Sequence, residues 1–272
     1  MTDRLKILVV AAHPDEAEEY ASGTLSLLAD QGHFIKVVTI TNGDAGHFHL
    51  GPKALARVRA TEAYEASKII GLADYEIWDE HDGDLADTPA LRKRMLRTVR
   101  QWRTDLIITF TDDEPGHNDN RLAGRLVRKA LPVSVLPNRC RSVPPLPQLP
   151  VVLKMIDYGS VDRHRPDIAV DITSVLDRKL AACVAHASQF LGLTPEQSGL
   201  ADSVPDPSDT DAAHQFVLEH WSQYIRTAEN ARPALHRVYG PRADSIEFAE
   251  TFEVADFGRQ LSVEDVDKLL QI

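Results

Sequence analysis

The sequence predicts an α/β fold in which a Rossmann-like, mostly parallel sheet is covered by helices on both faces. Apolar runs at 5–12, 34–40 and 105–110 alternate with amphipathic segments at 54–70 and 89–103. Strands that are apolar along their whole length are typical of a parallel sheet that is covered on both faces. The alternation of strand and helix patterns indicates right-handed βαβ units.

The elements of the first half follow from local patterns. A strand at 5–12 precedes a helix at 21–32, in which leucines recur at helical spacing and Gly32 marks the end. Gly71 closes the second helix in the same way. The remaining elements are, in order, a strand at 34–40, a helix at 54–70, a strand at 75–78, a helix at 89–103 and a strand at 105–110.

The second half is interrupted by a proline-rich segment, 131–150, which we expect to be irregular. Ser262 is a typical N-cap for a last short helix. The expected elements are a helix at 121–130, strands at 151–156 and 168–172, a helix at 175–190, a polar loop at 195–211, a helix at 212–230, a strand within 243–257 and a helix at 262–272.

Composition excludes several classes of function. The formal net charge of −11 argues against nucleic acid and against an anionic membrane surface as partners. No apolar run approaches the roughly 20 residues of a spanning helix, and the N-terminus does not resemble a secretory signal. Cys140 and Cys183 are far apart and read as reduced thiols. We therefore expect a cytoplasmic protein.

A cluster of polar residues stands where the first strand ends. The apolar run stops at His13-Pro14-Asp15-Glu16, which combines side chains suited to metal binding and to acid–base chemistry. Ligands bind at the carboxyl ends of strands in open α/β sheets. Pro14 fixes its own φ and keeps His13 out of the helical region, so the chain turns sharply here. A strand-to-helix turn capped by Asp15 is the structural alternative.

The segment 13–25 resembles the opening motif of the PIG-L/LmbE-like N-acetylglucosaminyl deacetylases. Further blocks match the family in the family's order: 41–46, Arg59 with Glu62, 82–85, 166–173 and 186–189. The resemblance runs from about residue 5 to residue 189. It implies a deacetylase-like α/β domain over 1–190, with 191–272 as a C-terminal extension packed on that domain.

The resemblance implies a metal-dependent hydrolase that removes an acetyl or similar acyl group from an N-acetylated amino sugar or small conjugate. His13 matches a zinc ligand of the family, and Asp15 matches the general base. Glu16 stands where the family has an Asp ligand. A zinc ion with three protein ligands and one open position suits amide hydrolysis.

The third ligand of the family is a histidine, and the matching position here is Asn120. His117, three residues earlier, could replace it if a helical turn begins there. Alternatively Asp112, Asp113 or Asp119 could build a carboxylate-rich site better suited to Mg²⁺, Mn²⁺ or Ca²⁺ than to Zn²⁺. The segment 118–120 is also a good N-cap cluster for the following helix.

Four further residues match positions of the family site. His186 matches a histidine that lies near the reacting carbonyl and assists catalysis, although a buried helix histidine remains the alternative. Arg59 and Asp82 match positions that contact substrate, and we assign Asp119 to substrate binding with them. Arg59 could equally pair with a surface carboxylate such as Glu62.

Two other functions compete with hydrolysis. Because Asn120 replaces a ligand, the chain could be a pseudoenzyme that binds a sugar-like ligand without turnover. Dinucleotide binding is disfavoured, since no Gly-x-Gly-x-x-Gly follows the first strand. The expected partner is a small N-acetylated sugar or conjugate, and a homo-oligomeric state stays open.

Overall fold

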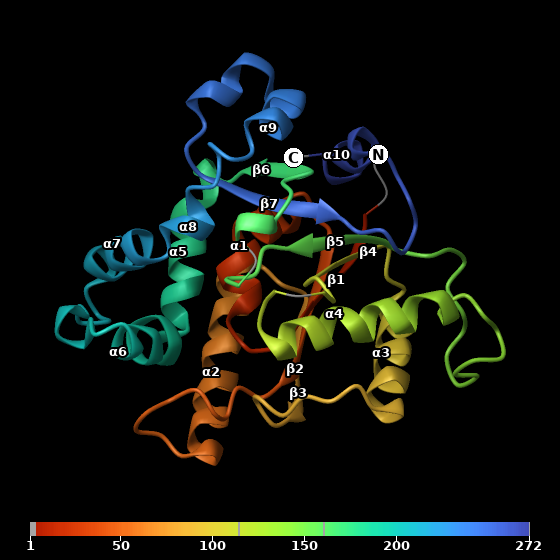
Figure 1. Cartoon of the computed structure of the whole chain (residues 1–272), viewed down its shortest axis with the longest axis horizontal. Coiled ribbons are helices and arrows are strands. Elements are labelled where there is room, and N and C mark those ends of the chain that lie inside the picture. The colour runs from red at the N-terminus through yellow and green to blue at the C-terminus, as the bar shows by residue number, and fades with distance from the viewer. Residues whose placement is uncertain (1–3, 114, 160, 272) are drawn as a thin grey trace.

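A seven-stranded sheet forms the centre of the molecule (Figure 1). The structure, a computed structural model, describes residues 4–113, 115–159 and 161–271. The strand order is β3-β2-β1-β4-β5-β7-β6. The strands are β1 (Lys6–Ala11), β2 (Phe34–Thr41), β3 (Asp74–Glu80), β4 (Leu106–Thr109), β5 (Val151–Met155), β6 (Ile168–Asp171) and β7 (Ala249–Val254).

Helices cover both faces of this sheet, as the sequence predicts. One face packs against the first, second and fifth helices, and the other against the third and fourth. The helices are α1 (Glu16–Asp30), α2 (Pro52–Ile70), α3 (Pro89–Trp102), α4 (Asn118–Ala130), α5 (Leu176–Ala185), α6 (Thr194–Gln197), α7 (Thr210–His220), α8 (Ser222–Ile225), α9 (Arg232–Tyr239) and α10 (Val263–Leu270).

Strand β1 is buried on both faces. Ile7 and Val9 belong to the core beneath α1, whereas Leu8 and Val10 belong to the core beneath α3 and α4. Alternate residues of a strand point to opposite faces, so a strand in this position must be apolar along its length. The strand therefore ends inside the molecule, and the residues that follow it lie at the edge of the sheet where ligands bind.

Helix α1 begins five residues earlier than predicted. It starts at Glu16, directly after Asp15, whose φ is 124°. The Glu16 carboxylate accepts hydrogen bonds from the amides of Ala12 and His13, both at 2.8 Å. These bonds hold the turn between strand and helix, so the motif itself starts the helix rather than the apolar residues further along.

The C-terminal part of the chain completes the sheet. Strand β7 comes from the predicted extension, yet it lies between β5 and β6 and runs antiparallel to both. The predicted helix at 212–230 is broken at Trp221, whose ring lies 4.9 Å from that of Phe190. The predicted loop at 195–211 contains α6. No helix in the described part of the chain is long and apolar enough to cross a membrane.

One buried arginine organises the proline-rich segment, which is irregular as predicted. The side chain of Arg100, on α3, is 2% exposed. Its guanidinium donates to carbonyl oxygens along that segment, namely those of Val133, Ser134, Leu136, Arg139, Cys140 and Val143. A segment that cannot form regular hydrogen bonds is thus tied to the fold by a side chain.

Gly124 allows α4 to lie directly on the end of β4. A Cβ atom at this position would stand 2.4 Å from the carbonyl oxygen of Phe110 and 2.9 Å from that of Thr111. We expect Gly124→Ala to lower the free energy of unfolding by about 1–3 kcal/mol, because the backbone must move apart. Gly51→Ala is the matched control, since nothing lies within 4 Å there. Urea denaturation measures both variants, and equal decreases in their free energies of unfolding would contradict this prediction.

Candidate metal centre

A cavity of about 580 Å³ opens at the carboxyl ends of β1 to β4. Its lining includes three residues of the opening motif, His13, Asp15 and Glu16. Loops contribute Asp82 and His117, and Arg59 enters from α2. The C-terminal segments from 189 to 224 form the opposite wall. Residues far apart in the sequence therefore meet in one pocket, as expected for this edge of an α/β sheet.

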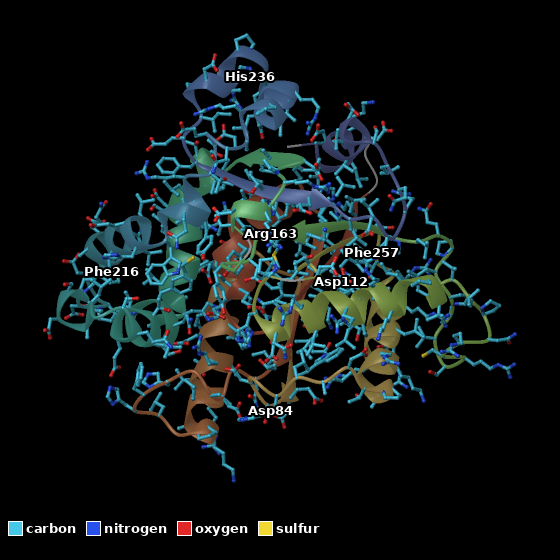
Figure 2. All side chains as sticks on the ribbon, viewed as in Figure 1. Asp84, Asp112, Arg163, Phe216, His236 and Phe257 are labelled. Carbon is cyan, nitrogen blue, oxygen red and sulfur yellow. The ribbon has the colours of Figure 1, made fainter. Side chains whose placement is uncertain are left out.

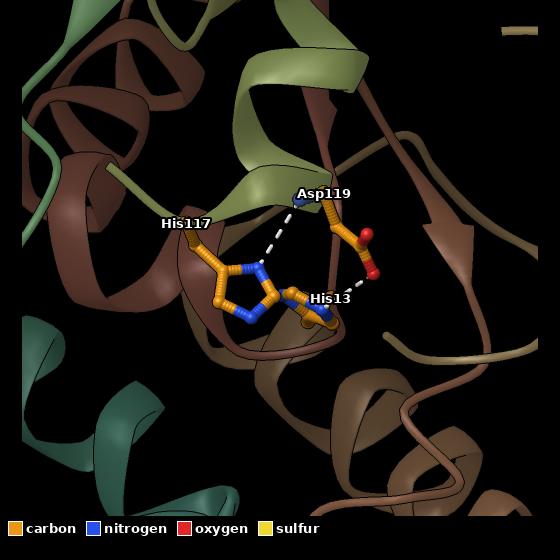
Figure 3. Close-up of side chains that lie close together, drawn as sticks. All are labelled: His13, His117 and Asp119. Atoms are coloured by element: carbon orange, nitrogen blue, oxygen red, sulfur yellow. Dashed lines mark hydrogen bonds and ion pairs between the residues drawn. The ribbon is translucent and has the colours of Figure 1, made fainter. Parts of the chain in front are cut away.

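His13, His117 and Asp119 form a compact cluster in this cavity (Figure 3). One ligand atom from each lies within 4.8 Å of the others. The two imidazole rings meet edge to face with their centroids 4.9 Å apart. Asp119 approaches His13 Nε2 at 3.5 Å and also accepts a hydrogen bond from the amide of Gly83. Two imidazoles and a carboxylate are a donor set that suits a catalytic divalent cation.

Each ring is held by a neighbour. His13 Nδ1 lies 3.0 Å from Glu16 Oε1, which leaves Nε2 facing Asp82 Oδ1 at 2.9 Å. His117 is the N-cap of α4, and its Nδ1 accepts a hydrogen bond from the amide of Asp119. The contact of His13 with a carboxylate is the kind that fixes the orientation of an imidazole ligand in metal sites, with the other ring nitrogen left to bind the metal.

The cluster favours positive charge. Burial alone would lower the pKa of His13, but the Glu16 carboxylate and hydrogen bonds with Asp119 and Asp82 raise it well above its ordinary value. Burial would likewise raise the pKa of Asp82 and Asp119, yet the contacts with His13 lower both. A site that stabilises a proton among carboxylates also suits a bound cation.

Unpaired buried atoms agree with a cation site. Among the described residues, Asp119 Oδ1 and Asn120 Oδ1 are buried and lack a hydrogen-bond partner. Such atoms are costly in a folded protein unless a ligand or water satisfies them. Both belong to residues at or beside the cluster, so the residues present fit a divalent metal.

Glu16 and Asn120, the other two predicted ligands, are otherwise engaged. Both carboxylate oxygens of Glu16 contact Ala12 or His13. Asn120 is buried behind the cavity wall, and its Nδ2 donates to Asp157 Oδ2 at 3.4 Å. The structure thus brings together His13 with His117 and Asp119. Asp119, which we predicted to bind substrate, is fully buried and belongs to the cluster instead.

The helix predicted at 121–130 begins three residues earlier, and its N-cap is His117 rather than a residue of 118–120. His117 has extended backbone angles, and the helix begins at Asn118. His117 and Asn120 therefore do not share a helix face, and only His117 reaches the cavity. Asp157, which sequence reasoning missed, accepts hydrogen bonds from the His117 amide and from Asn120. Asp157 lies two residues after the end of β5, and a carboxylate at the end of a strand was the signal in the sequence that could have identified it.

Two aspartates of the loop after β4 are not at the site. Asp112 pairs with Arg128 at 2.5 Å, and the guanidinium of Arg128 lies over the ring of Phe257. Figure 2 labels Asp112 and Phe257 near each other, on the side of α4. Asp113 is exposed. Of the three aspartates that we considered for a carboxylate-rich site, only Asp119 therefore lies in the cluster.

Asp15 lies in the cavity wall beside the cluster. It is 4% exposed, and Arg59 Nη1 approaches its Oδ2 at 3.5 Å. Burial raises the pKa of Asp15 to about 6, against the opposing effects of Arg59 and His186. Arg59 also donates to Gln189 Oε1 and lies near the carbonyl of Pro14. Arg59 is therefore a buried partner of Asp15 rather than a surface ion-pair residue.

His186 lies behind Asp15 and is fully buried. It is not among the residues that line the cavity, so direct contact with a reacting carbonyl, as predicted, does not follow from this position. Its Nε2 lies 3.5 Å from Glu18 Oε2. Burial alone would lower the pKa of His186, but Glu18 raises it.

The comparisons with known proteins agree with this geometry. The family model described as GlcNAc-PI de-N-acetylase matches residues 8–131. Diacetylchitobiose deacetylase of Thermococcus kodakarensis is 28% identical over 229 residues, which are 83% of this chain and 76% of that protein. 4-Oxalmesaconate hydratase of Pseudomonas putida is 27% identical over 195 residues, covering 69% of this chain and 75% of that protein.

The fold is also found among solved structures. That of N,N'-diacetylchitobiose deacetylase from Pyrococcus horikoshii superposes with a TM-score of 0.68 at 22% identity. The match covers 92% of this chain and 83% of that one. Together with the ordered motifs and the cavity at the strand ends, these findings agree with one another: residues 8–131 match the PIG-L family model, and the chain is similar to deacetylases of the LmbE/PIG-L superfamily.

Proposed function

We propose that the protein is a metal-dependent N-deacetylase that hydrolyses the acetamide of an N-acetylated amino sugar or a similar small conjugate. The observation that carries the proposal is the cluster of His13, His117 and Asp119, which shares a cavity with the buried carboxylate of Asp15. Amide hydrolysis needs an activated water, a base and stabilisation of negative charge on the carbonyl oxygen. The cavity offers groups for each task.

The metal that we propose is zinc, held by His13, His117 and Asp119, with Asp82 beside them. Imidazole ligands favour zinc over magnesium or calcium, which take oxygen ligands. When bound, the cation would lower the pKa of a water molecule and polarise the acetamide carbonyl. Glu16 orients His13, and Asp157 holds the backbone of His117, so both support the ligands from behind.

Asp15 takes the proton of the attacking water. A pKa of about 6 leaves this carboxylate ionised at neutral pH and still basic enough to accept a proton, which is the balance that a general base needs. Arg59 keeps Asp15 in place, and the Glu18–His186 pair lies behind it. Asp82 and Arg59 line the cavity and are placed to bind sugar hydroxyls.

The pseudoenzyme hypothesis is not retained. It depended on the loss of a third ligand at Asn120, and His117 with Asp119 offers a complete donor set next to His13. The relatives named above are enzymes. One of them is a hydratase, and the same fold can carry more than one reaction. The reaction product must therefore be measured to establish deacetylation.

The test is release of acetate. We expect protein loaded with one equivalent of Zn²⁺ to release acetate from N-acetylglucosamine or N,N'-diacetylchitobiose, and a chelator to stop the reaction. Acetate is quantified enzymatically and the free amine by a fluorogenic reagent. Metal-loaded protein that releases neither product from these acetamido sugars would contradict the proposal.

Replacing His117 separates the two possible ligand sets. We expect His117→Ala to weaken Zn²⁺ binding by about 10-fold or more, the range that even supporting residues of metal sites show on mutation. Asn120→Ala is the matched control and is expected to change the affinity by less than about threefold, because Asn120 is turned toward Asp157. Competition with a chromophoric chelator measures both. A larger loss of Zn²⁺ affinity in Asn120→Ala than in His117→Ala would indicate that Asn120, at the position that the family uses, provides the third ligand.

A further inference from the structure

The far end of the cavity is lined by a carboxylate and aromatic rings. Glu19 and Tyr20 come from α1, and His220, Trp221 and Tyr224 come from the segment where α7 meets α8. We call these five residues the aromatic end. Glu19 and Tyr20 lie within the residues that the family model matches, whereas the other three lie beyond them. None of the five belongs to the metal cluster.

Glu19 places a negative charge near the metal cluster. It follows Glu16 by three residues on α1, so the two side chains lie on one helix face about 5–6 Å apart at Cβ. Among the described residues, Glu19 has no ion-pair partner. The nearby Lys179 ammonium donates instead to Glu250 and to the backbone carbonyls of Glu18 and Glu19. Lys179 therefore lowers the pKa of Glu19 only in part, against larger opposing effects, and its ammonium bonds to the Glu250 carboxylate rather than to that of Glu19.

The surroundings of Glu19 make this charge costly. Burial, together with the neighbouring carboxylates of Asp15 and Glu16, raises the pKa of Glu19 well above its ordinary value. A ligand that brings a positive charge would relieve this cost, whereas a carboxylate or phosphate would add to it. The charged residues of the cavity are mostly acidic, and Arg59 is already paired with Asp15.

The rings beside Glu19 suit a cation as well. Tyr20 and Tyr224 meet edge to face with centroids 5.1 Å apart, and Trp221 packs on Phe190. Each of the three lining rings is less than 10% exposed and therefore fixed in position. An ammonium group between aromatic rings and a carboxylate gains both from the ring quadrupoles and from a charge-assisted hydrogen bond.

We infer that the aromatic end binds a protonated amine of the substrate, so that favoured substrates carry a free amino group besides the acetamide. The inference rests on the proposed deacetylation and specifies its substrate class. An amino sugar linked to an N-acetylated sugar has this chemistry, and so does a mono-acetylated diamine. In both, the ammonium contacts Glu19 while the acetamide faces the metal cluster one helical turn away.

Binding of matched probes tests the inference. Isothermal titration of zinc-loaded Asp15→Asn protein compares glucosaminyl-β1,4-N-acetylglucosamine with N,N'-diacetylchitobiose, which lacks the free amine. We expect the cationic disaccharide to bind about 10-fold more tightly, and Glu19→Gln to reduce this ratio below about threefold. Glu229→Gln, on the surface, is the matched control and keeps the ratio. A comparison of the affinities for N-acetylputrescine and N-acetylbutylamine shows whether an amine without a sugar is enough for tighter binding.

Several outcomes overturn the inference. Equal binding of the two disaccharides, or an unchanged ratio in Glu19→Gln, removes it. If circular dichroism shows that the Glu19→Gln variant does not fold, the ratio of the two disaccharide affinities in the Asp15→Asn protein decides by itself. Hydrolysis by the wild type separates the two proposals. Acetate release with no preference for the amine overturns only the subsite, whereas amine-selective binding without acetate release overturns only the hydrolase.

Discussion

Asp15→Asn is expected to slow acetate release roughly 10²- to 10⁴-fold, the contribution that a positioned general base makes. The amide has the size of the carboxylate but cannot accept the proton of the attacking water. The fold should be retained, because Asn is among the few non-glycine residues that tolerate the positive φ of 124° found here. The measurement is the rate of acetate release at equal zinc content.

Asp84→Asn is the matched control for this experiment. Asp84 lies on the loop after β3 that also carries Asp82, but it is exposed, and Figure 2 shows it at the outer edge of the molecule. We expect its rate to stay within about twofold of the wild type, since exposed substitutions away from a site have small effects. An Asp15→Asn protein as active as this control would remove Asp15 from the mechanism.

Lys179→Met is expected to lower the free energy of unfolding by about 3–5 kcal/mol, the usual cost of breaking a buried ion pair. Lys179, on α5, is fully buried and donates to Glu250 Oε1 at 2.7 Å. Glu250 also accepts from the amides of Gly23 and Thr24. The pair therefore joins α5, α1 and β7, and its loss leaves the charge of Glu250 buried without compensation.

Two further variants interpret that result. Lys268→Met removes an exposed lysine paired with Asp265 and is expected to change stability by less than about 1 kcal/mol. Combining Lys179→Met with Glu250→Gln removes the uncompensated charge, so the double variant should be more stable than Lys179→Met alone. Chemical denaturation curves provide all three values. A double variant less stable than the single one would show that packing, not charge, sets the cost.

Much of this fold could be predicted because the patterns are local. The apolar run of β1 predicts a buried strand, and the motif from His13 to Glu16 predicts a site at its end, since a parallel sheet leaves no other place for polar residues. Ser262 marks the start of α10 in the sequence as it does in the structure. These features depend on neighbours within a few residues, which is the range that propensity and capping reflect.

Other features depend on contacts that no local pattern reveals. The insertion of β7 between β5 and β6 pairs residues that are far apart in the sequence, such as Leu153 with Val254 and Ile168 with Phe252. The aromatic end is set by Trp221, where packing on Phe190 breaks a continuous helical pattern. Tertiary packing overrides propensity in such places.

The sequence by itself determined the α/β sheet, the motif at the end of β1 and the family to which they point. Only the tertiary structure decided which side chains meet there. Helix α4 starts one residue after His117, so His117 and Asp119 face His13 whereas Asn120 faces Asp157. A helix turns each successive residue by about 100°, so neighbours such as Asp119 and Asn120 point in different directions, and only the folded chain shows which of them reaches the site.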